Sequence, residues 1–260
     1  MRFDPQIRRR DAWRARGFQL VYPAMNRLLL RSPKVELAPH PVPPPTTVRI
    51  PTRYGSIEAL VYSPTPESLA APRAEGRRPP VHMLLHGGAF ILQYTKGEGN
   101  VARYLAAELG CYVVMPHYRA APQVRHPVAQ HESFDAYRWV RESGAAHGWD
   151  TERVTVGGPS TGGHFTLTVA LQAIDEGYRQ PDALSVEFAP TDLGLGREDR
   201  SSTKKRPIIT PGLVDLVKAT YFTGADVTSP LASPIRHPRL GELTPLLVLS
   251  TLTLVFGLFP

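Results

Sequence analysis

The sequence predicts an α/β fold in which helices flank a mostly parallel central sheet. Short apolar runs rich in β-branched residues alternate with longer segments whose apolar residues recur at helical spacing. This alternation is typical of strand–helix–strand units, in which a helix returns the chain so that the next strand runs parallel to the last. Two of the apolar runs stop at glycine-rich turns, around residues 86–88 and 157–162. Ligands of such sheets bind at the carboxyl ends of the strands, so we expect the functional site at these turns.

The chain has 260 residues, of which 42% are hydrophobic and 20% charged, a composition that can form a sizeable core. Residues 38–45 contain five prolines and are expected to form a stiff, extended linker. The sequence therefore divides into a leading segment, residues 1–45, and an α/β domain, residues 46–260. Residues 1–34 are predicted to be helical, with a break near Pro23.

The remaining elements follow from apolar periodicity and from glycine and proline stops. Two antiparallel strands are expected at the start of the α/β domain, around a turn at Tyr54 and Gly55, and the parallel sheet begins at Val81. The predicted strands span residues 46–50, 56–62, 81–85, 111–115, 154–156, 184–188 and 246–250, and the predicted helices span residues 96–109, 131–141, 161–177 and 211–221.

The segment Gly158-Pro159-Ser160-Thr161-Gly162 lies between a predicted strand and a predicted helix. Glycines two positions before and after the serine let the strand and the helix pass closely without Cβ clashes. A serine on such a corner sits on a strained turn with its hydroxyl exposed. Ser160 is therefore the candidate nucleophile.

The strand predicted at residues 81–85 stops at His86, Gly87 and Gly88. Glycines at the end of a strand leave backbone N–H groups free to point into a cleft. Such N–H groups can bind the negative charge that develops on a carbonyl oxygen during acyl transfer. The N–H groups of Gly87 and Gly88, with that of Thr161 after the serine, are the predicted oxyanion donors.

Three motifs together resemble the hormone-sensitive-lipase-like branch of the α/β-hydrolases. They are the glycine loop after His86, the corner around Ser160, and residues 117–122, His-Tyr-Arg-Ala-Ala-Pro, which are similar to the family's Asp-Tyr-Arg-Leu-Ala-Pro segment and depart from it at His117 and Ala120. The resemblance implies an esterase or lipase that hydrolyses carboxylic esters through an acyl-enzyme on Ser160. It also implies that the N-terminal helices form a cap over the pocket, that the substrate is a small-molecule ester, and that no cofactor is needed.

The family places the catalytic acid after the next-to-last strand and the histidine after the last strand. Here residues 251–260 contain neither, and Leu254 stands about where the aspartate is expected. The last carboxylate, Glu242, and the last histidine, His237, both precede the strand predicted at residues 246–250. The expectation is a truncated or frameshifted member that lacks the last strand and helix. Completion by a partner chain and a membrane-bound apolar tail are the alternatives.

No other histidine is a good substitute for the missing base. His164 lies one helical turn after Ser160, where a side chain leans away from the hydroxyl. His86 is expected to pack the glycine loop, His117 to be structural, and His237 to lie at the surface. The acid and the base are therefore left unassigned, and the alternative function is a catalytically inactive hydrolase-fold remnant or a binding protein.

The net charge of +7 is concentrated at the start of the chain, since residues 1–34 hold nine basic and two acidic residues. No zinc-finger spacing or aromatic nucleic-acid motif accompanies this charge, which argues against nucleic acid. The preferred interpretation is a solvated helix that covers the mouth of the site. Peripheral membrane contact through the basic N-terminus is the alternative, because apolar residues such as Leu20 and Val21 accompany the arginines.

The sequence predicts a cytoplasmic protein. Cys111 is the single cysteine and is expected to be a buried thiol, which agrees with a reducing compartment. No secretory signal and no run of membrane-spanning length is recognised. No metal site is predicted, because no carboxylate or cysteine cluster accompanies His82 and His86. The oligomeric state is left open.

Overall fold

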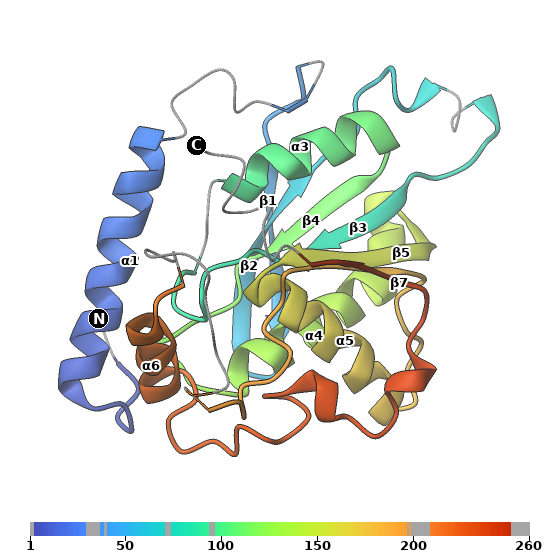
Figure 1. Cartoon of the computed structure of the whole chain (residues 1–260). Coiled ribbons are helices and arrows are strands. Elements are labelled where there is room, and N and C mark those ends of the chain that lie inside the picture. Colours follow the sequence, from blue (N-terminus) through green and yellow to red (C-terminus); the bar gives the residue numbers. More distant parts are fainter. Residues whose placement is uncertain are drawn as a thin grey trace.

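The computed structural model describes residues 3–29, 37–38, 41–70, 74–93, 97–196, 198 and 209–250, and the side chains of residues 23–29 are not described. Within these ranges the centre of the molecule is a seven-stranded sheet in the order β1-β2-β4-β3-β5-β6-β7 (Figure 1). The strands are β1 (Thr46–Thr52), β2 (Gly55–Tyr62), β3 (Pro80–Leu84), β4 (Tyr112–Pro116), β5 (Asp150–Pro159), β6 (Leu184–Glu187) and β7 (Leu246–Leu249).

Helices cover both faces of this sheet. In Figure 1, α3 lies over one face and α4 and α5 lie under the other, while α1 and α6 stand together at one side. The helices are α1 (Arg9–Leu29), α3 (Gly97–Leu109), α4 (Val128–Ser143), α5 (Thr161–Asp175) and α6 (Pro211–Thr220). Short 3-10 turns span Gly144–His147, Pro234–Arg236 and Leu240–Glu242.

The pairing of the strands confirms the predicted α/β class. β1 and β2 form an antiparallel hairpin, with Thr46 opposite Val61 and Thr52 opposite Gly55, and β2 also pairs antiparallel with β4. All later pairs, β3 with β4 and β5, β5 with β6, and β6 with β7, are parallel. The sheet is therefore mostly parallel and flanked by helices, as the strand–helix alternation predicts.

Alternation along the central strands distributes the core over both faces. Val113 and Met115 of β4 pack with residues of α3, whereas Val114 between them belongs to the larger cluster on the other face. Successive side chains of a strand point to opposite faces, so a strand covered on both sides must be apolar throughout. This is why β4 is a continuous apolar run in the sequence.

Helix α1 is continuous where the sequence predicts a break. The predicted break near Pro23 is wrong, because α1 continues through this residue to Leu29. Proline removes one backbone donor while the turns on either side keep theirs, so a helix can continue past it with one hydrogen bond fewer. The apolar tail, residues 251–260 with Leu254, lies outside the described residues. No helix in the described ranges is both long and apolar enough to cross a bilayer.

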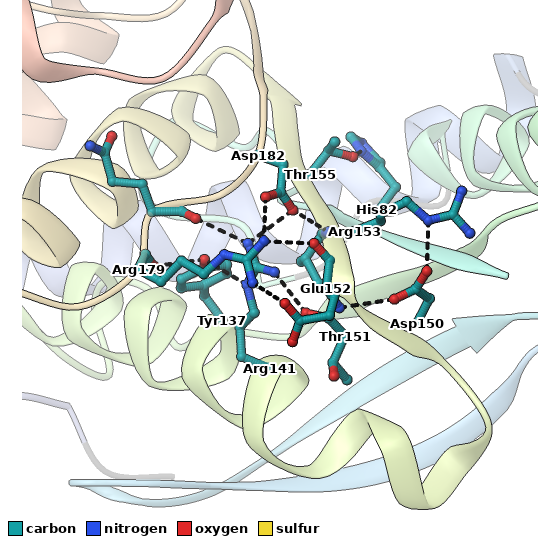
Figure 2. A network of polar contacts seen from close by, with 12 residues as sticks. His82, Tyr137, Arg141, Asp150, Thr151, Glu152, Arg153, Thr155, Arg179 and Asp182 are labelled. Atoms are coloured by element: carbon teal, nitrogen blue, oxygen red, sulfur yellow. Dashed lines mark hydrogen bonds and ion pairs between the residues drawn. The ribbon is translucent and has the colours of Figure 1, made fainter. Parts of the chain in front are cut away.

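A polar network holds the amino end of β5, opposite the predicted site (Figure 2). The Arg141 guanidinium, at the end of α4, is only 5% exposed. It donates to the Thr151 carbonyl at 2.7 Å, to the Gln180 carbonyl at 3.0 Å and to the Asp182 carboxylate at 3.0 Å. Asp182 also accepts the Val154 N–H at 2.7 Å. One side chain thus ties α4, β5 and the segment before β6 together.

Replacing Arg141 by methionine is expected to lower the free energy of unfolding by about 2–3 kcal/mol, because it leaves the Thr151 and Gln180 carbonyls without their buried donor and takes one of its donors from the Asp182 carboxylate. Equilibrium urea unfolding measures this change. Arg138 on the same helix is the matched control, since its side chain is 41% exposed and its ion pair with Glu142 is at the surface. Arg138→Met is expected to change stability by less than about 1 kcal/mol. Equal losses in the two variants would contradict a special role for the buried guanidinium.

Candidate active site

The corner around Ser160 joins the end of β5 to the start of α5. Ser160 has φ 53° and ψ −120°, a conformation that is uncommon for a residue with a side chain and costs backbone strain. Two backbone hydrogen bonds hold it there: the Ser160 N–H donates to the Glu187 carbonyl at 2.7 Å, and the Ser160 carbonyl accepts the His164 N–H at 3.1 Å. Hydrogen bonds to β6 on one side and within α5 on the other therefore hold Ser160 in its strained conformation.

The two glycines that flank the serine are required by the packing of this corner. A Cβ atom at Gly158 or at Gly162 would collide with the carbonyl oxygen of Leu85, the residue that follows β3. The same segment is bonded to β5, since the Leu85 N–H donates to the Gly157 carbonyl at 2.8 Å. The Gly-x-Ser-x-Gly spacing thus lets α5 begin directly against the neighbouring strand.

The loop after β3 is fixed by His86 and Tyr118. The His86 Nδ1–H donates to the Gly87 carbonyl at 2.7 Å, and the imidazole stacks on the Tyr118 ring with centroids 4.1 Å apart. The Tyr118 hydroxyl donates to the His86 carbonyl. Burial lowers the pKa of His86 to about 4, so the ring is neutral at physiological pH. His86 packs the loop, as its position in the sequence predicts.

The N–H groups of this loop differ in what they contact. Gly87 donates its N–H to the Glu98 carboxyl at 3.1 Å, so this donor is already engaged. The N–H groups of Gly88, Ala89 and Thr161 have no acceptor within the described part of the chain. Of the three predicted oxyanion donors, Gly88 and Thr161 therefore have open N–H groups and Gly87 does not. The open N–H group of Ala89 is not predicted by the sequence.

The loop is held against α5 and α1. The Phe90 N–H donates to the Thr161 hydroxyl at 3.2 Å, and the Gln19 side chain of α1 donates to the Ile91 carbonyl at 2.7 Å. Ala89 and Phe90 both have positive φ, 52° and 56°, although neither is glycine. These contacts from two helices maintain a conformation that the loop sequence would not favour alone.

Ser160, Ala89 and Thr161 line a cavity of about 210 Å³. Its walls are mostly apolar, and one of them is formed by α6. The other lining residues are Phe90, Phe188, Pro190, Asp192, Leu193, Ile209, Leu213, Val214 and Val217. Asp192 carries the one acidic group of this lining, and the Arg236 guanidinium lies 2.9 Å from it. A serine hydroxyl, open N–H donors and apolar walls together suit the acyl part of an ester.

His164 follows Ser160 by one helical turn, but its ring is fully engaged elsewhere. Its Nδ1–H donates to the Pro190 carbonyl at 2.9 Å, while Nε2 lies 3.4 Å from the Gln130 side-chain nitrogen and 3.1 Å from the Leu231 carbonyl. Burial lowers the pKa of His164 to about 4. This histidine braces the loops around the cavity and cannot turn toward the serine without breaking these contacts.

Among the described residues, the other two histidines considered from the sequence form no hydrogen bond with the Ser160 hydroxyl either. His237 is buried, contrary to the predicted surface position, and its Nε2 lies 3.1 Å from the Asp175 carboxylate at the far end of α5. It is buried because the Pro234–Arg236 turn packs on α5. His117 follows β4, and burial lowers its pKa. Within the described ranges no side chain forms a hydrogen bond with the Ser160 hydroxyl.

Glu98, in the first turn of α3, is a further residue beside the site that the sequence analysis did not single out. Burial raises the pKa of its carboxyl to about 7, and the nearby Glu187 carboxyl acts in the same direction. The only sequence signal was an acidic residue in the first helical turn, which usually marks a solvated helix end. Across the described residues no three histidine, cysteine or acidic side chains gather closely enough to bind a metal ion.

Comparison with known proteins agrees with this architecture. Residues 82–252 match the family described as alpha/beta hydrolase fold. An esterase of known structure from Pyrobaculum calidifontis is 30% identical and superposes with a TM-score of 0.77, over 90% of this chain and 73% of that one.

Two curated relatives match over shorter stretches. A putative acetyl-hydrolase of Mycobacterium tuberculosis is 30% identical over 151 residues, which cover 58% of this chain and 48% of that protein. The hormone-sensitive lipase of Ictidomys tridecemlineatus is 32% identical over 140 residues, which cover 53% of this chain and 18% of that protein. This chain therefore spans half or less of the length of these relatives. The resemblance predicted from the three motifs is confirmed: the chain belongs to the α/β-hydrolase fold family, in its hormone-sensitive-lipase-like branch of esterases and lipases.

Proposed function

We propose that this protein is a carboxylic-ester hydrolase in which Ser160 is the nucleophile. The observation that carries the proposal is the strained corner at Ser160, which lines an apolar cavity together with two residues that have open N–H groups, Ala89 and Thr161. A serine held at positive φ on a strand-to-helix turn is the arrangement that exposes a nucleophilic hydroxyl. Membership in an esterase and lipase family supports the same chemistry.

In the proposed reaction the acyl group of an ester occupies the apolar cavity. The carbonyl oxygen accepts hydrogen bonds from the open N–H groups of Gly88, Ala89 and Thr161, which stabilise the negative charge that develops on it. The Ser160 oxygen attacks the carbonyl carbon and its proton leaves to a base, the alcohol departs, and water then releases the acid from the acyl-enzyme. The base and its acid partner are not assigned, because His164 and His237 are engaged elsewhere.

The size and lining of the cavity favour a short apolar acyl chain. About 210 Å³ is small for a site of this class, and Leu213, Val214 and Val217 of α6 present no charge to it. The proposed substrates are therefore small esters of short-chain acids.

Hydrolysis of p-nitrophenyl butyrate tests the proposal. The Ser160→Ala variant is expected to lose about 10³-fold or more of the wild-type kcat/KM, because no nucleophile remains. Ser143→Ala, at the far end of α4, is the matched control and is expected to retain the wild-type rate. Equally slow hydrolysis by wild type and Ser160→Ala would refute the proposal.

The second candidate function is a catalytically inactive hydrolase-fold protein that binds a ligand in the same cavity. The absence of a hydrogen-bond partner for the Ser160 hydroxyl within the described ranges favours it, since an unassisted serine is a poor nucleophile near neutral pH. This alternative predicts equal hydrolysis by wild type and Ser160→Ala. It also predicts that butyrate still binds to wild type, measured by calorimetry, and fails to bind to Val217→Trp, which fills the cavity.

A further inference from the structure

Helix α1 is attached to the rest of the protein by one narrow face. Ala12 and Ala15 are fully buried on this face, and Gln19, one turn further on, reaches the Ile91 and Ala121 carbonyls at 2.7 and 2.9 Å. Residues three and four positions apart lie on the same side of a helix, so these three residues define the side that faces the protein. Figure 1 shows the helix at the edge of the molecule, beside α6.

The opposite side, here called the outer face of α1, combines arginines with large apolar residues. Trp13 is 57% exposed, Leu20 58% and Val21 65%, although a helix on a protein surface normally turns polar side chains outward. The outer face consists of Arg9, Arg10, Trp13, Arg14, Leu20 and Val21, all of them exposed. The Phe3 ring packs edge-on against Trp13, with centroids 5.3 Å apart, and adds to the apolar part.

The charge of this face is strongly positive. Among the described residues one ion pair offsets it, between Arg14 and Asp11 at 3.5 Å, and it is weak because the Arg14 side chain is exposed to solvent. Arg9 and Arg10 lie at the start of the helix, while Leu20 and Val21 lie about three turns later on the same side. Cations and apolar groups therefore share one surface.

We propose that the outer face of α1 binds peripherally to an anionic phospholipid bilayer. The guanidinium groups would pair with lipid phosphates, the Trp13 ring would lie at the level of the headgroups, and Leu20 and Val21 would enter the acyl boundary. A nucleic acid would satisfy the arginines but would leave Leu20 and Val21 in water. The exposed aliphatic pair therefore favours a lipid surface over a nucleic acid.

The bilayer site lies close to the proposed ester site without depending on it. The outer face belongs to the helix whose other side packs on the Ile91 loop, and α1 also contacts α6, which lines the cavity. Vesicle binding requires no catalysis. Ser160→Ala is expected to bind vesicles as wild type does, so failure of either proposal can be told from failure of the other.

Co-sedimentation with vesicles of phosphatidylcholine and phosphatidylglycerol tests this inference. Wild type is expected to bind vesicles that contain phosphatidylglycerol, to be released as salt is raised, and to bind phosphatidylcholine vesicles far more weakly. The variant R9Q/R10Q/R14Q is expected to bind roughly 100-fold more weakly, since each arginine near an anionic surface contributes a several-fold gain in affinity.

A control removes the same charge elsewhere. R49Q/R77Q/R78Q takes three exposed arginines from other surfaces and is expected to keep wild-type binding.

L20S/V21S keeps every charge and is expected to bind more weakly, while Trp13 fluorescence shifts to the blue on binding in wild type and not in W13F. Circular dichroism confirms that each variant is folded.

Three outcomes would overturn the inference. Wild type could fail to bind vesicles that contain phosphatidylglycerol, or the control triple variant could lose as much affinity as R9Q/R10Q/R14Q. In the third outcome L20S/V21S binds vesicles as wild type does, and a duplex oligonucleotide binds the outer face as tightly as the vesicles. That result would assign the face to nucleic acid instead.

Discussion

Substitution of Gly162 by alanine is expected to destabilise the protein by about 3 kcal/mol or more. The added Cβ atom would collide with the Leu85 carbonyl oxygen and would lie only 2.9 Å from the His86 carbonyl oxygen. Both are backbone atoms of the segment that follows β3, so neither can rotate away as a side chain would. Relief requires α5 to move from β3, which would also displace Ser160 from the cavity.

Gly17→Ala is the matched control for this prediction. Gly17 lies within α1, and a Cβ atom there would meet nothing within 4 Å. Alanine is the better helix former, so this variant is expected to gain about 0.5–1 kcal/mol. Urea unfolding is expected to show a lower free energy of unfolding for Gly162→Ala and a higher one for Gly17→Ala. Such opposite effects of the same substitution would show that the contact of the new Cβ atom at the corner decides the change in stability. A Gly162→Ala variant as stable as wild type would contradict the tight packing described for this corner.

The sequence predicts the sheet well where burial shapes composition. Strand β4 is apolar throughout, and β3 departs from this pattern only at His82, because helices cover both faces of the two strands. The amino end of β5 shows the limit of this reasoning. Residues 154–156 were predicted as strand, whereas β5 begins at Asp150. The additional residues are polar, and they are held by pairing with β3 and by the network around Arg141, which no local pattern reveals.

The site is predictable only in part, for a similar reason. The glycines around Ser160 carry a local signal, because a close passage of strand and helix demands them. Which N–H groups of the loop after β3 are open depends on a long-range contact. Glu98 comes from the next helix and engages the Gly87 N–H, whereas the Ala89 N–H has no acceptor in the described part of the chain. Neither the spacing nor the type of these residues indicates which N–H group is engaged and which is open.

Glu98 provides the last prediction, which concerns pH. Burial is the largest effect on its carboxyl and raises its pKa to about 7; Glu187 also raises it, and the Gly87 N–H opposes the rise. Tyr118 is the other titratable side chain coupled to this carboxyl in the described ranges. A carboxyl with a raised pKa binds its proton more tightly in the folded protein than in the unfolded chain. Protonated Glu98 therefore favours folding, and ionised Glu98 opposes it.

The sign of the pH dependence follows from this difference. The contribution of Glu98 is fully present below its ordinary pKa near 4.5 and is lost as pH rises through about 7. Glu98→Gln keeps an oxygen that can accept the Gly87 N–H and carries no charge at any pH. The variant is expected to match wild type near pH 5 and to be more stable at pH 8 by up to about 3 kcal/mol.

Urea unfolding of both proteins from pH 4.5 to 8.5 measures this difference, with Glu108→Gln as the control because Glu108 is exposed in the last turn of the same helix. The control is expected to follow the wild-type curve. If Glu98→Gln and wild type give parallel curves over this range, the carboxyl is already ionised in the folded protein. Glu98 would then accept the Gly87 N–H as a charged carboxylate. The loop beside Ser160 would carry a negative charge, which disfavours an oxyanion.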